Sequence, residues 1–518
     1  MLYKFTRKIP ENVKIVSIAV VLVVTLFLLQ GNIEFSLSDE GYLWYGTWRT
    51  SLGEIPLRDF RSYQPGRYYW GAGWSLLFGH GIMGLRASVA IFQVLGLACG
   101  LFTIRRLTRS WLALWSIGFL FLMWMHPQYK IFEHSLAMAL VYVGTILVEK
   151  PTLRRHFGAG MLGGMMMCFG ENHGFCGIVS LLGLISFIWY KIDRSDLFRR
   201  LVAWGVGISV GYTPMLFMFI FVPGFFTSFV QRILSLFQRE SLNLTLPVPW
   251  PWKIQVVGGD LLEIVRAVSA GIFFVILPTF CVLVGAYLLW TKRDLKRHAP
   301  LLASFAAVMT YIHYTFSRAD LSHLTFSMHP LLIGLLSLPL LYKHILPKKL
   351  LIGMFLVLFC LSTFSVASAI PYCRKLVAPK HDFVKITIHG DQLWLPTRQA
   401  KLIQTVLNIH AERILPDEGL VIAPYWPGFY PILQRKSPWW DTYITWSVSE
   451  DEQNRMISDL QTHRVNWVVL GDVALKGTYE LRFRNTHPLV WRHIQENFEP
   501  VPVSGLPSKY QLLKRISP

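Results

Sequence analysis

The chain alternates between long stretches without a charged residue and short stretches that carry several. The first uncharged stretch runs from residue 15 to residue 33, close to the ~20 residues that a helix needs to cross a bilayer core. Further uncharged stretches lie at 87–104, 110–129, 135–148, 156–170, 172–190, 201–231, 267–291, 298–317, 321–342 and 350–373. Because lipid offers no hydrogen bonds to the backbone, we expect these stretches to be helices. The pattern predicts an α-helical polytopic membrane protein with about 11 spans.

Two of these stretches are short. The stretches 135–148 and 156–170 do not reach full membrane length, so we expect their helices to begin in polar surroundings within the bundle, or one of them to be re-entrant. The first stretch also fits a cleaved leader. However, Gln30-Gly31-Asn32 lacks the small residues of a cleavage site, which favours a first span.

Residues 372–518 follow a different pattern, with no stretch long enough to span. Ser449-Glu450-Asp451-Glu452 has the form of a capping box that opens a helix to about Arg464. The other expected elements are strands at 419–424, 465–470 and 510–514 and a helix at 488–497. Helices and strands in alternation predict a C-terminal α/β domain. We therefore divide the chain into a transmembrane domain, 1–371, with a first outer loop at 31–83, and an α/β domain, 372–518.

Composition and charge agree with this division. The chain is 53% apolar and 15% charged, against about 25% charged residues in an ordinary soluble protein. Its formal net charge of +20 would suit a nucleic-acid partner, but the basic residues gather between the apolar stretches. Their distribution favours a cytoplasmic N-terminus and places the C-terminal domain on the opposite, periplasmic face. We expect membrane lipids as partners and no nucleic acid. The six scattered cysteines predict neither a disulfide framework nor a metal site.

The segment after the first span carries the candidate chemistry. It begins Ser38-Asp39-Glu40-Gly41-Tyr42. Two adjacent carboxylates at the mouth of a membrane helix are costly to desolvate and are functional candidates. Asp39 is also a good N-cap for a helix from Glu40 to about Leu52. Local physics leaves both roles open, and they are compatible with each other.

Three spaced elements of this loop resemble a known family. They are Asp39-Glu40, then Gly53-x-x-Pro56-x-x-Asp59-Phe60, and then Pro65-Gly66-x-Tyr68-Tyr69. Together with the span order, they resemble the GT-C glycosyltransferases that use polyprenyl-phosphate sugars, such as the protein O-mannosyltransferases and the lipid A aminoarabinose transferase. The likeness in motif covers residues 35–110.

The resemblance implies a function and a place for the catalytic base. It implies a bacterial inner-membrane enzyme that moves a hexose or pentose from a polyprenyl-phosphate donor to a periplasmic glycan, lipid A or lipopolysaccharide, or protein. It also implies that an acid of the Asp-Glu pair activates the acceptor, with Asp39 as first choice and Glu40 as second. A hydroxyl that attacks C1 needs a carboxylate within hydrogen-bond reach, and one-step attack inverts the anomeric centre.

Other residues of the loop are candidates for substrate binding. The chain departs from the family in Gln64, where many members carry proline, and in the added Arg58, Arg61 and Arg67. These arginines either pair with Asp59 and Glu54 or bind the donor phosphate. Tyr68 and its aromatic neighbours either stack on sugars or belong to the interfacial aromatic belt.

A second cluster lies between two later spans. Arg318, Asp320 and His323 form a candidate phosphate clamp in which Asp320 orients one of the other two. The alternatives are a local Arg318–Asp320 pair or, for Asp320 and His323, two ligands of a metal. Lys130 and Arg239 are secondary candidates for phosphate contact. The complete substrate-binding set is Asp59, Arg61, Arg67, Tyr68, Lys130, Arg239, Arg318, Asp320 and His323.

We therefore predict an inverting glycosyltransferase with no required cofactor. No metal site is assigned, and a divalent metal is left open. The main alternative is a transporter or flippase of lipid-linked sugars, although the chain shows neither a hydropathic repeat nor midplane charges. A structural assembly factor with an inactive site is a third alternative.

Overall fold

The computed structural model describes residues 9–237, 246–254, 260–291 and 295–516. The chain forms two compact units. The span unit comprises Met1–Gly31 and Val89–Leu376, and the loop–tail unit comprises Asn32–Ser88 and Val377–Pro518. This grouping differs from the division expected from the sequence, because the first outer loop belongs with the tail and not with the spans.

The uncharged stretches form helices, of which the first is α1 (Glu11–Gln30) and the last is α15 (Lys348–Val366). Each stretch is helical over most of its length, as expected from the need to satisfy the backbone in lipid. The helices between them are α4 (Ile82–Arg105), α5 (Trp111–Met123), α6 (Ile131–Glu149), α7 (Leu153–Phe169), α8 (Glu171–Lys191), α9 (Leu197–Gly211), α10 (Thr213–Phe221), α11 (Phe225–Phe237), α12 (Leu261–Trp290), α13 (Ala299–Ser317) and α14 (Leu321–Leu341).

The count of 11 spans is not confirmed, because fewer of the described helices qualify as candidate spans. Among the described residues, 7 helices are long and apolar enough to cross a membrane, or up to 8 if the bent pair α9 and α10 is one span. That pair is bent by 55°, and Pro214, in the first turn of α10, cannot donate the backbone hydrogen bond that would continue α9. α5 has 13 residues and α7 has 17. An uncharged stretch therefore predicts a helix more safely than it predicts a full crossing.

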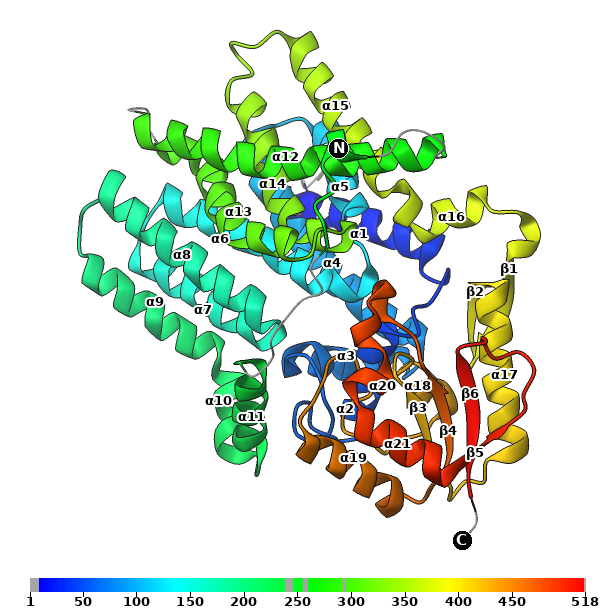
Figure 1. Ribbon diagram of the computed structural model, residues 1–518. Helices are drawn as coiled ribbons and strands as arrows, with labels where there is room; N and C mark the ends of the chain where they lie inside the picture. The colour runs from blue at the N-terminus through cyan, green and yellow to red at the C-terminus, as the bar shows by residue number, and fades with distance from the viewer. Residues whose placement is uncertain (1–8, 238–245, 255–259, 292–294, 517–518) are drawn as a thin grey trace, which may run out of the picture. The chain divides into compact units, whose positions relative to one another are not determined.

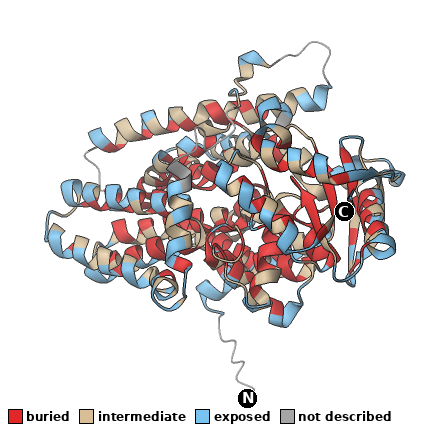
Figure 2. Ribbon diagram, turned by 60° about the horizontal axis from the view of Figure 1, so that its bottom comes forward, coloured by how far each residue is buried: buried red, intermediate tan, exposed pale blue. Residues whose placement is uncertain are grey.

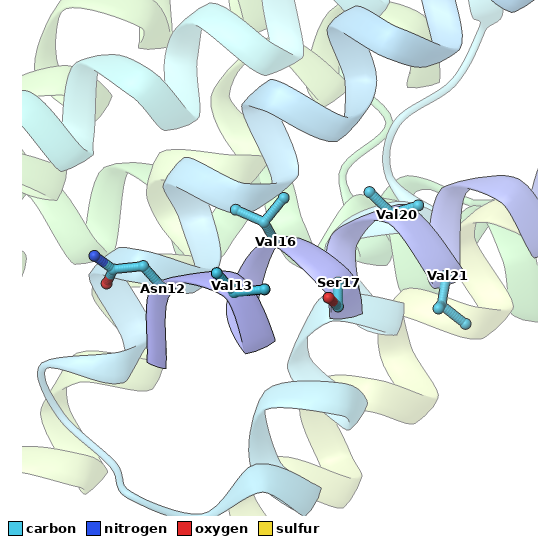
Figure 3. Close-up of a pocket in the computed structure, with 6 residues that line it drawn as sticks. All are labelled: Asn12, Val13, Val16, Ser17, Val20 and Val21. Carbon is cyan, nitrogen blue, oxygen red and sulfur yellow. The ribbon is translucent and has the colours of Figure 1, made fainter. Parts of the chain in front are cut away.

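The helices of the span unit differ in how much of their surface other helices cover. The apolar windows of α6 and α14 are each 72% buried, whereas that of α1 is 22% buried. α13 packs against α6, α8 and α14. The outward side of α1 carries a shallow groove (Figure 3) that is lined by Asn12, Val13, Val16, Ser17, Val20 and Val21. Such an apolar outer side suits contact with lipid chains.

The loop–tail unit combines helices from the first outer loop with a small α/β fold (Figure 1). Its strands form a hairpin, β1 with β2, and a four-stranded sheet of order β3-β4-β6-β5, in which β3 and β4 are parallel and the other pairs antiparallel. β3 and β4 are buried along nearly their whole length, in line with the largely red strands of Figure 2. Its elements are α2 (Asp39–Ser51), α3 (Pro65–Phe78), β1 (Phe383–Ile388), β2 (Asp391–Pro396), α17 (Thr397–Arg413), β3 (Gly419–Ala423), α18 (Phe429–Leu433), α19 (Glu450–Thr462), β4 (Val465–Gly471), α20 (Phe483–Thr486), α21 (Pro488–Asn497), β5 (Phe498–Val501) and β6 (Tyr510–Arg515).

Most of the tail elements expected from the sequence are confirmed. Ser449 caps α19, where its hydroxyl accepts the Glu452 N–H at 3.3 Å, and β3, β4, α21 and β6 lie at the predicted positions within a residue or two. The hairpin β1–β2 and the edge strand β5 were not predicted. Both lie in mixed polar and apolar segments, and strand pairing with distant partners stabilises them.

Backbone contacts explain why the loop belongs with the tail. The Trp394 N–H donates to Asn32 O and the Glu34 N–H donates to Trp394 O, both at 2.8 Å, so the segment after the first span pairs with β2. The Asp391 carboxylate accepts the Met83 N–H at 3.0 Å at the start of α4. These hydrogen bonds connect the first outer loop directly to the tail.

Candidate functional site

Asp39 begins the helix that follows the first span. It is the first residue of α2, and Ser38 occupies the N-cap position without a side-chain cap. The N-cap is therefore Ser38, one residue before the expected Asp39, and the Ser36 hydroxyl accepts the Asp39 N–H at 3.2 Å. The half-buried Asp39 carboxylate accepts a long hydrogen bond, 3.4 Å, from the Tyr443 hydroxyl. It is in no ion pair with a residue that the structure describes.

Glu40, the neighbouring acid, is held by an ion pair. Arg86 Nε donates to Glu40 Oε1 at 2.6 Å and Arg86 Nη2 to Oε2 at 2.7 Å. Both side chains are buried. The Arg86 fork thus occupies both carboxylate oxygens of the second candidate base.

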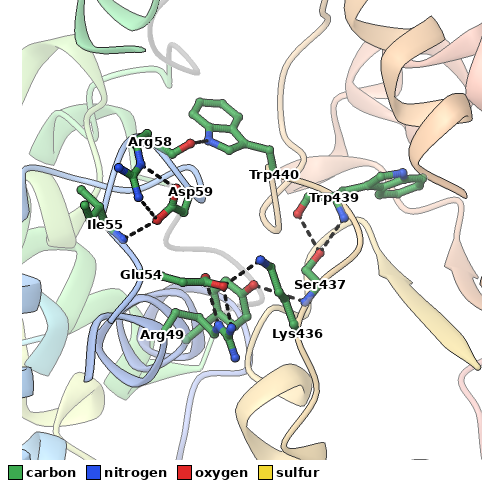
Figure 4. Close-up of polar contacts among 10 residues, drawn as sticks. Arg49, Glu54, Ile55, Arg58, Asp59, Lys436, Ser437, Trp439 and Trp440 are labelled. Carbon is green, nitrogen blue, oxygen red and sulfur yellow. Dashed lines mark hydrogen bonds and ion pairs between the residues drawn. The ribbon is translucent and has the colours of Figure 1, made fainter. Parts of the chain in front are cut away.

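The remaining acids of the loop are also paired (Figure 4). Arg58 donates to both oxygens of Asp59, at 2.7 and 2.9 Å, and the Ile55 N–H adds a third bond at 2.8 Å. Burial acts to raise the pKa of the Asp59 carboxyl, but these hydrogen bonds outweigh it and hold that pKa below its usual value.

Glu54 has two cationic partners. It pairs with Arg49 at 2.6 Å and with Lys436 at 2.7 Å (Figure 4). Burial again acts to raise its pKa, and the bonds from Arg49 and Lys436 lower it overall. Of the two roles left open for the added arginines, Arg58 therefore takes the ion pair with Asp59. Glu54, however, pairs with Arg49 and not with an added arginine.

Arg61, Arg67 and Tyr68 lie inside the loop–tail unit. Arg61 forms an ion pair with Asp441 of the tail. Arg67 is 3% exposed and lies over the Tyr63 ring at 4.7 Å. Tyr68 is fully buried, and its hydroxyl accepts the Tyr63 N–H at 3.0 Å. In this conformation these three side chains contact other residues of the loop–tail unit.

A short tail segment, residues 437–443, completes the surroundings of Asp39. The Tyr443 N–H donates to Asp441 Oδ1 at 2.9 Å, and the Tyr443 ring lies 5.8 Å from that of Tyr42 in α2. The Arg61 N–H donates to Trp440 O at 2.8 Å.

Sequence reasoning missed two residues of this site. It did not assign Arg86 or Asp441. Arg86 carried one detectable signal, since an arginine at the start of an apolar helix needs an acidic partner. Nothing local marked Asp441, because its partner Arg61 is distant in sequence.

The second predicted cluster lies in the span unit and its members are brought together. Asp320, the N-cap of α14, accepts from Arg318 Nε at 3.0 Å and pairs with His323 Nδ1 at 2.7 Å. Asp320 thus orients both partners and not one alone. Lys130 is the last residue of the 3₁₀ turn η1 (Gln128–Lys130), and its Nζ lies 3.5 Å from Ser322 O and 4.4 Å from the centre of the Phe326 ring. We call Lys130, Arg318, Asp320 and His323 the cationic cluster.

The remaining expectations concern Arg239 and a possible metal site. Arg239, a secondary phosphate candidate, lies outside the described residues. Across residues 9–237, 246–254, 260–291 and 295–516, no three His, Cys, Asp or Glu side chains gather as a metal-binding group.

The fold resembles solved structures, whereas two comparisons of the sequence found no match. No protein-family model and no curated protein sequence matches it. ArnT from Cupriavidus metallidurans bound to undecaprenyl phosphate is similar in structure, with a TM-score of 0.52, 13% identity and coverage of 98% of this chain and 99% of that chain. The apo state of that ArnT gives a TM-score of 0.51, 15% identity and 97% coverage of both chains.

An archaeal enzyme is similar to a comparable degree. AglB, the oligosaccharyltransferase of Archaeoglobus fulgidus in complex with an inhibitory peptide and a dolichol-phosphate, gives a TM-score of 0.50, 13% identity and coverage of 97% of this chain and 76% of that chain. ArnT and AglB are GT-C glycosyltransferases. At these identities the likeness concerns the fold, and the expected GT-C-like architecture with a C-terminal α/β region is confirmed.

Proposed function

We propose that this protein is an inverting membrane glycosyltransferase that moves a sugar from a polyprenyl-phosphate donor to an acceptor on the non-cytoplasmic face. The Asp39 carboxylate carries this proposal. It is half-buried and, among the described residues, unpaired with any cation, whereas Glu40, Glu54 and Asp59 each have an arginine partner. A carboxylate without a counter-charge keeps its oxygens available to accept a proton.

Asp39 would act as the general base. Its carboxylate would accept the proton of the acceptor hydroxyl while that oxygen attacks C1 of the sugar. The bond from C1 to the donor phosphate breaks in the same step, and the polyprenyl phosphate leaves with the bonding electrons. Tyr443 would hold one Asp39 oxygen through its hydroxyl. Glu40 is less suited to the role because Arg86 occupies both of its oxygens.

The cationic cluster would bind the donor phosphate. Lys130 and Arg318 offer positive charge, His323 offers a ring nitrogen for a hydrogen bond, and guanidinium groups match phosphate oxygens well. Asp320 fixes the orientation of Arg318 and His323. Two of the three solved structures named above contain a polyprenyl-type phosphate, which supports a donor of this class.

The proposed location follows from the apolar helices. The seven candidate spans and the GT-C fold support a membrane enzyme. α3 exposes Leu76 at 87% and Leu77 at 70%, as suits a helix lying on a lipid surface. The bacterial inner membrane, with the loop–tail unit in the periplasm, is the location that we propose from the distribution of basic residues.

The test is a transfer assay in reconstituted vesicles. A panel of radiolabelled undecaprenyl-phosphate sugars, including mannose, glucose and aminoarabinose, would be supplied with membrane extract as acceptor. We expect Asp39→Asn to lower transfer by about 10²–10⁴-fold, the contribution of a general base. Glu412→Gln, at an exposed position of α17, is the matched control and should transfer at the wild-type rate.

Two outcomes would contradict the proposal. Full transfer by Asp39→Asn would remove the base. Movement of the lipid-linked sugar across the vesicle membrane, without transfer by the wild type, would favour the flippase alternative.

A further inference from the structure

Arg86 bonds both to the first turn of α2 and to the segment that precedes it. Besides its two bonds to Glu40, its Nη2 donates to the backbone oxygen of Glu34 at 2.7 Å. Glu40 Oε2 also accepts the Ser36 N–H at 3.4 Å. One guanidinium and one carboxylate therefore fix the chain from Glu34 to Glu40, and Asp39 lies within that stretch.

The backbone of this turn needs such support. Glu34 has a φ of +57°, a left-handed conformation that costs a residue with a side chain about 1–2 kcal/mol. Non-glycine residues persist there only where their surroundings determine the conformation. Trp394 O accepts the Glu34 N–H from one side and Arg86 donates to the Glu34 O from the other.

The Glu40–Arg86 ion pair is not expected to contribute much to the free energy of unfolding. The two residues are 6% and 5% exposed, so both charges lose most of their hydration. Buried ion pairs replaced by apolar side chains of similar size often leave stability unchanged or raise it. A buried fork-to-fork pair does, however, fix geometry, because its two parallel bonds tolerate little rotation.

The position of Glu40 makes that geometry relevant to Asp39. Consecutive helical residues point about 100° apart, so a buried Glu40 leaves the preceding residue turned away from Arg86. Rotation of the first turn of α2 about its axis would move both side chains together. Anchoring Glu40 therefore fixes the direction of the Asp39 carboxylate.

We propose that Arg86 is a positioning residue that acts through Glu40 to hold the first turn of α2 and aim the Asp39 carboxylate. This inference rests on the proposed role of Asp39. It reassigns Glu40 from a second candidate base to the anchor of the first. Neither Arg86 nor Glu40 needs to touch the substrate.

The experiment compares full-length variants in the transfer assay, with the lipid-linked sugar that the wild type uses. Glu40→Met with Arg86→Met replaces the pair by apolar side chains of similar length. We expect an unchanged unfolding temperature, an unchanged KM for the donor, and a kcat about 10–100-fold lower, the effect of a misplaced catalytic group. Arg86→Lys keeps the charge without the fork and should recover part of that kcat.

A matched control and a reference variant complete the design. Arg49→Met removes another arginine that binds both oxygens of an acid, at the opposite end of α2, and should keep the wild-type kcat. Asp39→Asn measures the base itself.

Each outcome decides the inference. An inactive Asp39→Asn with a stable double variant of low kcat supports it, and so does partial recovery in Arg86→Lys. An inactive Asp39→Asn with a double variant at the wild-type kcat overturns the positioning role and leaves the proposed function intact. If the kcat of the double variant falls only in proportion to its loss of folded protein, the positioning role is also overturned. Full activity of Asp39→Asn overturns the proposed function, and with it the role of Arg86.

Discussion

Acids that are close in the sequence of the first outer loop differ in their ion-pair partners. Glu40 binds Arg86, Glu54 binds Arg49 and Lys436, and Asp59 binds Arg58. From the sequence, Asp39 and Glu40 are candidate bases at the mouth of a membrane helix, Asp59 is a candidate for substrate binding, and Glu54 is an expected partner of the added arginines. Arg58 and Arg49 are close in sequence to the acids they bind, whereas Arg86 and Lys436 come from other elements.

The residue scale also provides a test by pH. His487 is buried, its ring stacks on Phe483 with centroids 5.0 Å apart, and burial together with the nearby Arg61 charge lowers its pKa to about 3. An unfolded His titrates near 6.5. Between these values the unfolded state binds a proton that the folded state cannot, so stability falls as pH drops below about 6.5.

We expect His487→Phe to remove this part of the acid sensitivity. The slope of the unfolding free energy between pH 6 and pH 4 should become flatter by about 1.4 kcal/mol per pH unit. Chemical unfolding at several pH values, followed for wild type and variant, measures it. Equal slopes in the two proteins would show that His487 is not buried in the neutral form.

At the scale of elements, helix crossings depend on small residues that a hydrophobicity pattern ignores. α7 and α9 pack closely because glycines face backbone across their contact. A Cβ at Gly160 would meet Trp204 O, and a Cβ at Gly207 would meet Phe157 O. The uncharged stretches predicted both helices, yet they gave no indication that the two backbones approach each other.

Gly207→Ala should therefore destabilise the protein, by about 1–3 kcal/mol, because the new methyl group forces the two helices apart. Gly205→Ala is the control on the same helix, since nothing lies within 4 Å of its Cβ position. That change should be neutral or slightly stabilising, as alanine favours helix over glycine. Unfolding midpoints in detergent measure both variants, and equal midpoints would argue against the close crossing.

At the scale of the whole molecule, the first outer loop and the tail fold as one unit although more than half of the chain separates them. Asn32 and Glu34 pair with Trp394, and Asp391 holds the start of α4. Gly41 of α2 also lies directly against Gly428 of the tail, and a Cβ at Gly428 would be 3.1 Å from Gly41 Cα and 3.0 Å from Leu37 O. The candidate base thus depends on a correctly folded tail.

A change in the tail should consequently loosen the loop. We expect Gly428→Val to speed hydrogen exchange of the α2 amides by about 10-fold, which corresponds to 1.4 kcal/mol of local stability at the low end of overpacking effects. Leu415→Ala, at a tail position that is 60% exposed, is the control and should leave exchange in α2 unchanged. Exchange that speeds up only within the tail would contradict a shared unit.

The sequence by itself determined the helices, the α/β character of the tail and the acids worth testing. These depend on local quantities: uncharged length, capping residues and the high cost of charge beside lipid. Only the tertiary structure decided that the loop groups with the tail, and that Glu40 is bound by Arg86 while Asp39 is not. Those outcomes depend on contacts between residues far apart in the chain, which no local pattern encodes.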